Sequence, residues 1–318
     1  MTTRSEDWDE MIVLLGPQPR DFSDLAGLAR ELQLEGPVAL ITAAWQENES
    51  DDGALTDALG LSTVNLELHR RSEDVVRGEP EFIEAWTARQ KHLRHLQEFY
   101  RLRLEAIDDA AMAINVRHVD DRLIAEQNAM TISQLRHLDE EHLRRCSDIR
   151  FEFDHKWNPG ELPTVKKHRE ELAAMLNDCA SIVISGGHVV ALVNRLRLFD
   201  VLRHRGQRPI LAWSAGAMAL TDQIVLFHDS PPFGKNLAQV LDFGLGLCPG
   251  IVAMPDVSRR VHLDQKEGIG RFARRMAPAH CLALDPGARI TFREGRVHEL
   301  SHSGRLGESG DVNWEWTP

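Results

Sequence analysis

The sequence has no long hydrophobic run. No stretch approaches the roughly 20 apolar residues needed to cross a bilayer, and the opening MTTRSEDWDE contains no apolar signal-peptide segment. We therefore expect a cytoplasmic protein. Positive charge is also in short supply, because 37 basic residues face 49 acidic ones and give a formal net charge of −12. Such a charge repels phosphate backbones and anionic bilayers, which argues against nucleic acid and membrane as partners.

Cysteine is scarce, and the motifs that bind metals or nucleotides are missing. The four cysteines match neither a paired metal motif nor a dense disulfide framework. They are Cys146, Cys179, Cys248 and Cys281. We expect reduced thiols that fill the core. The chain also lacks HExxH, a phosphate-binding P-loop and the dinucleotide pattern Gly-x-Gly-x-x-Gly. We therefore predict neither a metal nor a cofactor.

Two parts of the chain alternate between apolar strands and amphipathic helices. The first contains MIVLLG, FSDLAGLARELQL and PVALITAAW, and the second contains SIVIS, VVALVNRLRLF and RPILAW. Such β-α-β alternation builds parallel sheets. We therefore predict an α/β fold with a doubly wound parallel sheet. Three short strands should follow near the end, GIVAM, HCLALD and ARITF, the last joined to GRVHEL by a hairpin turn.

A helical segment interrupts this core. Glycine is absent from Glu79 to Pro159, and apolar residues recur there at three- and four-residue spacing. One expected buried stripe contains Phe82, Trp86, Leu93, Leu96, Tyr100, Leu104 and Ile107, and a second contains Leu123, Met130, Leu135, Leu138 and Ile149. We predict a hairpin or small bundle that buries both. The expected organisation is residues 1–69 for the first part of the core, 70–158 for an inserted helical subdomain, 159–300 for the second part of the core and 301–318 for a loose tail.

Ser214 falls at the junction of a predicted strand and a predicted helix, in ILAWSAGAM. A serine at such a corner can project its hydroxyl outward, as in the nucleophile elbow of α/β-hydrolases. Gly216 supplies the small residue that lets the turn close, but Ala212 stands where the strict motif has glycine. The motif alone therefore leaves two interpretations open, a nucleophile and a small residue in a tight turn.

Four segments in order resemble the family of peptidase E (aspartyl dipeptidase) and cyanophycinase. They are SIVISGGH, WSAGAM, LGLCPGIV and HCLALDPGARITF. The family consists of serine peptidases with a class I glutamine amidotransferase-like fold, so the resemblance implies that fold and a nucleophilic Ser214. It covers residues 163–297 well and 38–65 weakly. The helical segment has no counterpart in it.

Serine chemistry needs hydrogen-bond donors for the oxyanion and a base for the hydroxyl proton. The natural donors are the backbone N–H groups of Ala215, at the helix start, and of Gly187 or its neighbour His188. His188 replaces the asparagine that the family has after the glycines, and it is a candidate substrate contact. An ordinary strand-end turn is the alternative interpretation of Gly186-Gly187.

The base is the main departure from the family pattern. Its histidine follows the Pro-Gly-Ile-Val strand, where this sequence has Asp256. A carboxylate is a far weaker base near neutral pH and lacks a donor for the leaving group. Two histidines offer compensation, His262 six residues downstream and His228 beside Asp229. We predict His262 as the base and Asp229 as its supporting acid, although each also fits a solvated surface residue.

The arginines after Asp256 form a basic cluster in an acidic chain. They are Arg259, Arg260, Arg271, Arg274 and Arg275. Because a guanidinium suits carboxylate recognition, Arg260 is a candidate substrate contact. A basic helix face paired with surface acids explains the cluster equally well.

Two functions remain open. The first is a serine hydrolase of short peptides or isopeptide-like amides. The second is a catalytically weak pseudoenzyme that binds or scaffolds through its helical insertion. In either case we expect a homo-oligomer.

Overall fold

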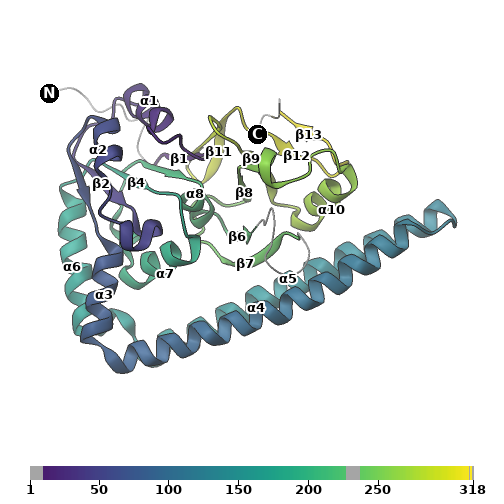
Figure 1. Cartoon of the computed structure of the whole chain (residues 1–318), viewed down its shortest axis with the longest axis horizontal. Helices are drawn as coiled ribbons and strands as arrows, with labels where there is room; N and C mark the ends of the chain where they lie inside the picture. Colours follow the sequence, from purple (N-terminus) through teal and green to yellow (C-terminus); the bar gives the residue numbers. More distant parts are fainter. Residues whose placement is uncertain (1–9, 227–236, 315, 317–318) are drawn as a thin grey trace.

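The computed structural model describes residues 10–226, 237–314 and 316. It has a mixed α/β architecture with a central, mostly parallel sheet and a long helical hairpin (Figure 1). No helix within these residues is long and apolar enough to cross a membrane. The four cysteines are free and buried, as predicted.

The central sheet has seven strands in the order β11-β10-β1-β5-β4-β2-β3. Their bounds are Ile12–Leu15 (β1), Val38–Ile41 (β2), Thr63–Asn65 (β3), Ser181–Ile184 (β4), Ile210–Trp213 (β5), Arg289–Arg293 (β10) and Arg296–Ser301 (β11). Five neighbouring strands are parallel, namely β1, β5, β4, β2 and β3. Strands β10 and β11 add an antiparallel edge. The predicted hairpin between the last two is confirmed.

Helices cover both faces of this sheet because successive strand residues point to opposite sides. One face packs against α1 (Ser23–Glu31) and α2 (Gly53–Leu59). The other packs against four later helices. These are α3 (Leu68–Gly78), α6 (Pro163–Asn177), α7 (Val189–Phe199) and α8 (Ala215–Leu220). Short 3₁₀ turns at Ala43–Asn48 (η2), Pro159–Glu161 (η3) and Val201–His204 (η4) complete this part of the fold.

Two smaller sheets follow the central one. The first has the order β13-β12-β9-β8, and the second pairs β6 with β7. Their strands are Gln223–Leu226 (β6), Gln239–Phe243 (β7), Ile251–Pro255 (β8), His280–Leu284 (β9), Arg305–Leu306 (β12) and Val312–Asn313 (β13). Helices α9 (Val257–Arg260) and α10 (Lys266–Met276) connect β8 to β9. The segment predicted as a loose tail therefore contributes two short strands to a sheet.

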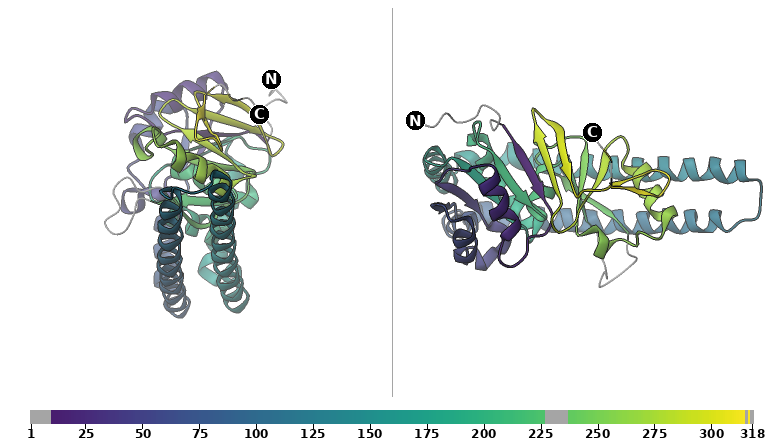
Figure 2. Two further views of the ribbon diagram at one scale, coloured as in Figure 1. Left: turned by 90° about the vertical axis from the view of Figure 1, so that its right-hand side faces the viewer. Right: turned by 90° about the horizontal axis from the view of Figure 1, so that it is seen from above.

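The helical segment forms one long antiparallel hairpin of α4 (Pro80–Asn115) and α5 (Asp121–Trp157). The two helices lie side by side, and their tip extends beyond the rest of the molecule (Figure 2). On α4, Phe82, Tyr100 and Leu104 are buried as expected. Leu123 and Met130, which were expected in a buried stripe, are exposed because they lie in the distal half.

A buried polar cluster attaches the hairpin to the core. Tyr100 on α4 donates to Asp139 Oδ1 on α5 (2.8 Å), and Arg275 on α10 contacts both carboxylate oxygens of Asp139 at 2.7 Å. The same arginine donates to the Tyr100 oxygen, which also accepts from the backbone N–H of Val240 on β7. Since all of these donors and acceptors are paired inside the protein, the cluster fixes the hairpin against β7 and α10.

Candidate functional site

Ser214 occupies the turn between β5 and α8, at the carboxyl end of the central parallel strands. Its backbone has φ 48° and ψ −113°, a region that residues with a side chain rarely adopt. The turn is held on both sides, because the Ser214 N–H donates to Leu15 O (3.1 Å) and its carbonyl accepts from Met218 N–H (3.0 Å). The residue is partly exposed. A strained, partly exposed serine between a strand and a helix is the geometry of a nucleophile elbow.

Two glycines make room for this turn. A Cβ atom on Gly216 would lie 2.7 Å from Ile184 O, and a Cβ atom on Gly186 would lie 2.8 Å from the Trp213 ring. Real Cβ atoms do not approach other atoms so closely, so both positions need glycine for the chain to pack as it does. Gly216 thus has the structural role that the sequence indicated for it.

The predicted oxyanion donors are the backbone N–H groups of Ala215, which follows Ser214, and of Gly187, which follows the Gly186 that packs against Ser214. Ala215 is the first residue of α8, where backbone N–H groups have no partner inside the helix. Gly187 is exposed, with φ 130°, and it packs closely against Ala44. The neighbouring His188 N–H already donates to Ala44 O (2.9 Å). Of the two donors considered in this turn, Gly187 is therefore the better one.

The His188 side chain has a structural role. Its Nδ1 accepts a hydrogen bond from the Ala191 N–H (3.2 Å) and so caps the start of α7. Because Nδ1 is an acceptor, the proton of the neutral ring is on Nε2. The residue is exposed.

Asp256 directly follows β8, on the same side of the fold as Ser214. The Asp256 N–H donates to Leu284 O (3.0 Å) at the end of β9. Asp285, which follows Leu284, is in close contact with Gly16, the residue after β1. Gly16 follows Leu15, the acceptor for Ser214 N–H. These contacts connect the carboxyl ends of the strands β5, β1, β9 and β8, in that order in space. Asp256 is 8% exposed, and its Oδ2 accepts from Arg259 Nη1 (3.3 Å).

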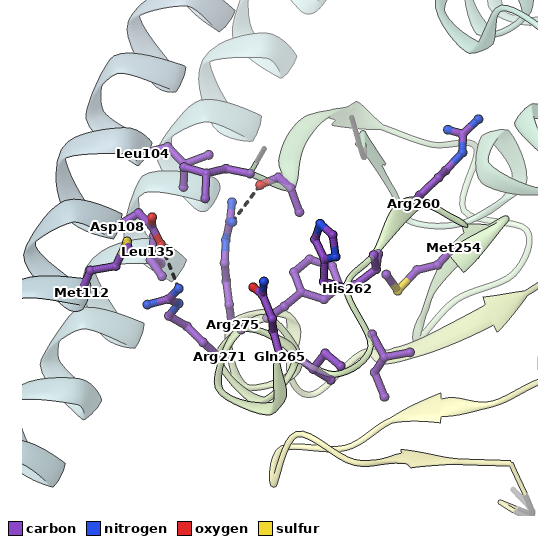
Figure 3. Close-up of a pocket in the computed structure, with 17 residues that line it drawn as sticks. Leu104, Asp108, Met112, Leu135, Met254, Arg260, His262, Gln265, Arg271 and Arg275 are labelled. Atoms are coloured by element: carbon purple, nitrogen blue, oxygen red, sulfur yellow. Dashed lines mark hydrogen bonds and ion pairs between the residues drawn. The ribbon is translucent and has the colours of Figure 1, made fainter. Parts of the chain in front are cut away.

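His262 and Arg260 line a cavity of about 330 Å³ beside the hairpin (Figure 3). His262 is exposed on the connection between α9 and α10, and no hydrogen bond of its ring to a described residue is present. Ser214 is not among the described residues that line this cavity. His228 and Asp229 lie outside the described residues. No group of three or more His, Cys, Asp or Glu side chains in the described ranges is arranged to hold a metal ion.

One residue at this cavity escaped the sequence interpretation. Asp108 on α4 is 7% exposed, lines the cavity and pairs with Arg271 Nη2 on α10 (3.0 Å). The sequence does show that Asp108 shares a helical stripe with the apolar residues Leu104 and Ile107, which indicates a buried carboxylate. It could not identify the partner, because Arg271 lies in a distant part of the chain.

Comparison with known proteins places the chain in a family of peptidases. Residues 139–300, about half of the chain, match the model of Peptidase family S51. The chain belongs to this family, which supports the resemblance to peptidase E drawn from the sequence. No curated protein sequence matches it.

Two solved structures are similar over most of their length. A peptidase from an acI-B1 Actinobacterium is 14% identical, with a TM-score of 0.46, and the match covers 94% of this chain and 91% of that one. A putative peptidase E protein from Listeria monocytogenes EGD-e is 12% identical, with a TM-score of 0.42, and the match covers 94% and 100%.

Proposed function

We propose that the protein is a serine hydrolase that cleaves short peptides or isopeptide-like amides. The observation that carries this proposal is the backbone of Ser214, held in a strained conformation at the end of β5 and partly exposed. Such strain persists only where the surrounding structure imposes it, and it is concentrated at functional sites. Membership of peptidase family S51 supports the same reaction class. Helices on both faces of the parallel strands support a doubly wound, glutamine amidotransferase-like core.

In this proposal the Ser214 oxygen attacks the amide carbonyl carbon while His262 takes the hydroxyl proton. The backbone N–H groups of Ala215 and Gly187 bind the oxyanion. His262 then gives its proton to the leaving amine, and an acyl-serine remains. A water molecule, deprotonated by His262, attacks this ester, which releases the acid and restores the Ser214 hydroxyl.

The remaining assignments concern support and binding. Asp229 orients the base, and His188 and Arg260 contact the substrate. We place the base at His262 and not at Asp256, because an ionised carboxylate is a weak base and the Asp256 carboxylate already accepts from Arg259. The substrate is a peptide or amide, and the cytoplasmic location stays a prediction.

A fluorophosphonate probe tests the nucleophile directly. We expect one covalent label on the wild-type protein and none on Ser214→Ala. Ser185→Ala is the matched control, because Ser185 lies one strand away, is fully buried and should not affect labelling. An unlabelled wild-type protein at high probe concentration, with the fold intact by circular dichroism, would overturn the proposal. Separate His262→Ala and His228→Ala variants then test the base, and only the first should slow labelling.

We also propose that the protein is a homo-oligomer assembled through the hairpin tip. Four of its large apolar side chains are exposed, namely Val116, Val119, Leu123 and Met130. Exposed apolar patches on a protruding element commonly mark association surfaces. The double variant Val116→Lys, Leu123→Lys should lower the mass measured by light scattering. An unchanged mass would exclude the tip as the interface.

A further inference from the structure

The cavity between the hairpin and α10 has largely apolar walls. The hairpin contributes Leu104 and Leu135, and the core contributes Met254, Ile269, Phe272 and Leu306. Its volume of about 330 Å³ lies at the lower end of the roughly 300–1,000 Å³ typical of small-molecule sites. The walls therefore suit a short aliphatic group and not a large ligand.

The charged side chains that line this cavity are mostly positive. Arg260, Arg271 and Arg275 line it, and Asp108 is the only carboxylate among the described residues that do so. Asp139, the ion-pair partner of Arg275, is not among these lining residues. The cavity thus presents positive charge in a chain whose formal net charge is −12. Such a lining favours an anionic ligand.

One of these arginines has a hydrogen-bond donor to spare. All three side-chain nitrogens of Arg275 already donate, Nε and Nη2 to Asp139 and Nη1 to the Ala238 carbonyl. Arg271 differs, because its Nη2 lies 3.0 Å from Asp108 Oδ1 while its Nη1 is buried and has no hydrogen-bond partner among the described residues. A buried donor without an acceptor costs free energy. An oxygen atom of a ligand or of water would satisfy it.

We infer that this cavity binds a small carboxylate with an aliphatic tail, the carboxylate at Arg271 and the tail against the apolar walls. Figure 3 shows Arg271 beside Asp108 on the hairpin side of the cavity. A charge-assisted hydrogen bond from the guanidinium offsets the desolvation of the ligand carboxylate. The aliphatic tail is stabilised by leaving water. Asp108 opposes binding, because it repels the carboxylate and neutralises part of the Arg271 charge.

This inference goes beyond the proposed function, because it concerns a ligand that is not a substrate. Ser214 is not among the described residues that line the cavity. A free carboxylate also has no amide bond for a hydrolase to cleave. Binding at this site can therefore be measured on the wild-type protein without turnover.

Isothermal titration calorimetry in phosphate-free buffer tests both parts of the ligand. 4-Methylpentanoate has the acid and a branched tail, 4-methylpentanamide has nearly the same shape without the charge, and acetate has the acid without the tail. We expect 4-methylpentanoate to bind at least tenfold more tightly than either of the others. N-Acetyl-leucine carries the same acid and tail as the carboxyl end of a peptide. Tighter binding of N-acetyl-leucine than of 4-methylpentanoate would assign a peptide end as the ligand, and weaker binding would assign a free acid.

Two substitutions at the ion pair should change the affinity for 4-methylpentanoate in opposite directions. Arg271→Met removes the cation and should weaken binding at least tenfold. Asp108→Asn removes the competing carboxylate and should tighten binding at least threefold. Because damage to the fold would weaken binding in both variants, opposite changes assign the effect to charge. Arg103→Met removes an exposed arginine of α4 that is not among the lining residues, and it should leave the affinity unchanged.

A double variant guards against misfolding caused by an unpaired charge. Arg271→Met, Asp108→Asn removes both charges and should bind 4-methylpentanoate as weakly as Arg271→Met alone. Wild-type affinity in this double variant would overturn the inference. So would equal binding of the amide or of acetate, or a change in the same direction in the two single variants. No binding of 4-methylpentanoate to the wild-type protein would mean that water alone meets the Arg271 donor, and it would overturn the inference as well.

The outcomes also separate this inference from the proposed function. If 4-methylpentanoate does not bind and Ser214 is labelled by the fluorophosphonate, only the inference about the cavity fails. If 4-methylpentanoate binds as expected and Ser214 is never labelled, only the hydrolase proposal fails.

Discussion

Gly186 lies so close to Ser214 that a Cβ atom on Gly186 would be 3.0 Å from the Cβ of Ser214. It would also be 2.8 Å from the indole of Trp213. Gly186→Ala therefore has to displace the β5–α8 turn. We expect a loss of about 1–3 kcal/mol in the free energy of unfolding, as for overpacked sites, and at least tenfold slower fluorophosphonate labelling of Ser214. Urea unfolding and labelling kinetics measure the two effects.

The matched control for this variant is Gly27→Ala in α1. No atom lies within 4 Å of a Cβ built on Gly27, and alanine is favoured over glycine inside a helix by about 0.5–1 kcal/mol. Gly27→Ala should therefore be neutral or stabilising and label normally. Normal labelling of Gly186→Ala would show that the turn tolerates displacement and would weaken the case for a precisely held nucleophile.

The cluster of Tyr100, Asp139 and Arg275 should dominate the attachment of the hairpin. Tyr100→Phe removes the acceptor for Val240 N–H and one partner of Arg275, which should cost about 1–3 kcal/mol. Asp139→Asn leaves the enclosed Arg275 without its counter-charge, and breaking a buried pair in this way costs about 3–5 kcal/mol. In equilibrium urea denaturation, Asp139→Asn should therefore have a lower free energy of unfolding than Tyr100→Phe.

A surface ion pair on α5, the helix that carries Asp139, provides the comparison. Arg144 and Glu141 are also paired, but both are exposed to solvent or nearly so. Because water screens such pairs, Arg144→Ala should leave the unfolding midpoint nearly unchanged. A similar loss of stability for Arg144→Ala and Asp139→Asn would contradict the role assigned to the buried cluster.

His142 should make the stability of the protein sensitive to mild acid. It is 3% exposed, its ring is 4.4 Å from that of Tyr100, and its Nε2 lies 3.1 Å from Leu241 O on β7. Burial lowers the pKa of this imidazole below its ordinary value. Between the unfolded and the folded pKa, the unfolded chain binds more protons than the native protein. The contribution of His142 is therefore fully present above about pH 6.5 and is lost as the pH falls through the folded pKa.

The measurement is the free energy of unfolding between pH 7.5 and 5. His142→Gln should be less stable at pH 7.5, because the packed ring is lost, but its stability should fall less steeply toward pH 5. His95→Gln is the control, because His95 is exposed on α4, and it should keep the wild-type slope. An equal slope in His142→Gln and the wild type would mean that other groups cause the acid sensitivity.

The sequence predicted the features of the site that depend on neighbouring residues. The apolar run before Ser214 and the small residues after it indicated the strand-to-helix turn, because both signals lie within ten residues. The role of Gly216 followed from the same local pattern. Folded geometry was needed to choose between the N–H groups of Gly187 and His188, because only the packing of that turn against Ala44 shows which one is already bonded.

The features that the sequence could not predict depend on distant parts of the chain. Asp139 and Arg275 are 136 residues apart, and nothing in either local pattern indicates their pairing. The three- and four-residue spacing of apolar residues also could not show that the hairpin tip extends beyond the core. The prediction that Leu123 and Met130 lie in a buried stripe was therefore wrong. Strands of two residues, such as β12, carry no detectable period at all.

Asp256 offers a test of where a base can act in this fold. It directly follows β8, on the side of the fold where β5 leads into Ser214, and its backbone has φ 61° and ψ 40°. Asp256→His would place an imidazole at the position where the family pattern has histidine. We expect His262→Ala to slow fluorophosphonate labelling by about 10²- to 10⁴-fold, the usual contribution of a general base. Adding Asp256→His to that variant should recover at least tenfold.

The control is Asp256→Asn in the His262→Ala background, which removes the same carboxylate from Arg259 but supplies no base. It should recover nothing, so a gain specific to histidine would show that the end of β8 is within reach of the Ser214 hydroxyl. The pH profile adds a second readout, because the recovered rate should rise with deprotonation of an imidazole near its ordinary pKa. If His262→Ala labels at the wild-type rate, His262 is not the base. If the recovery is equal for histidine and asparagine, relief of the Asp256 charge is its cause.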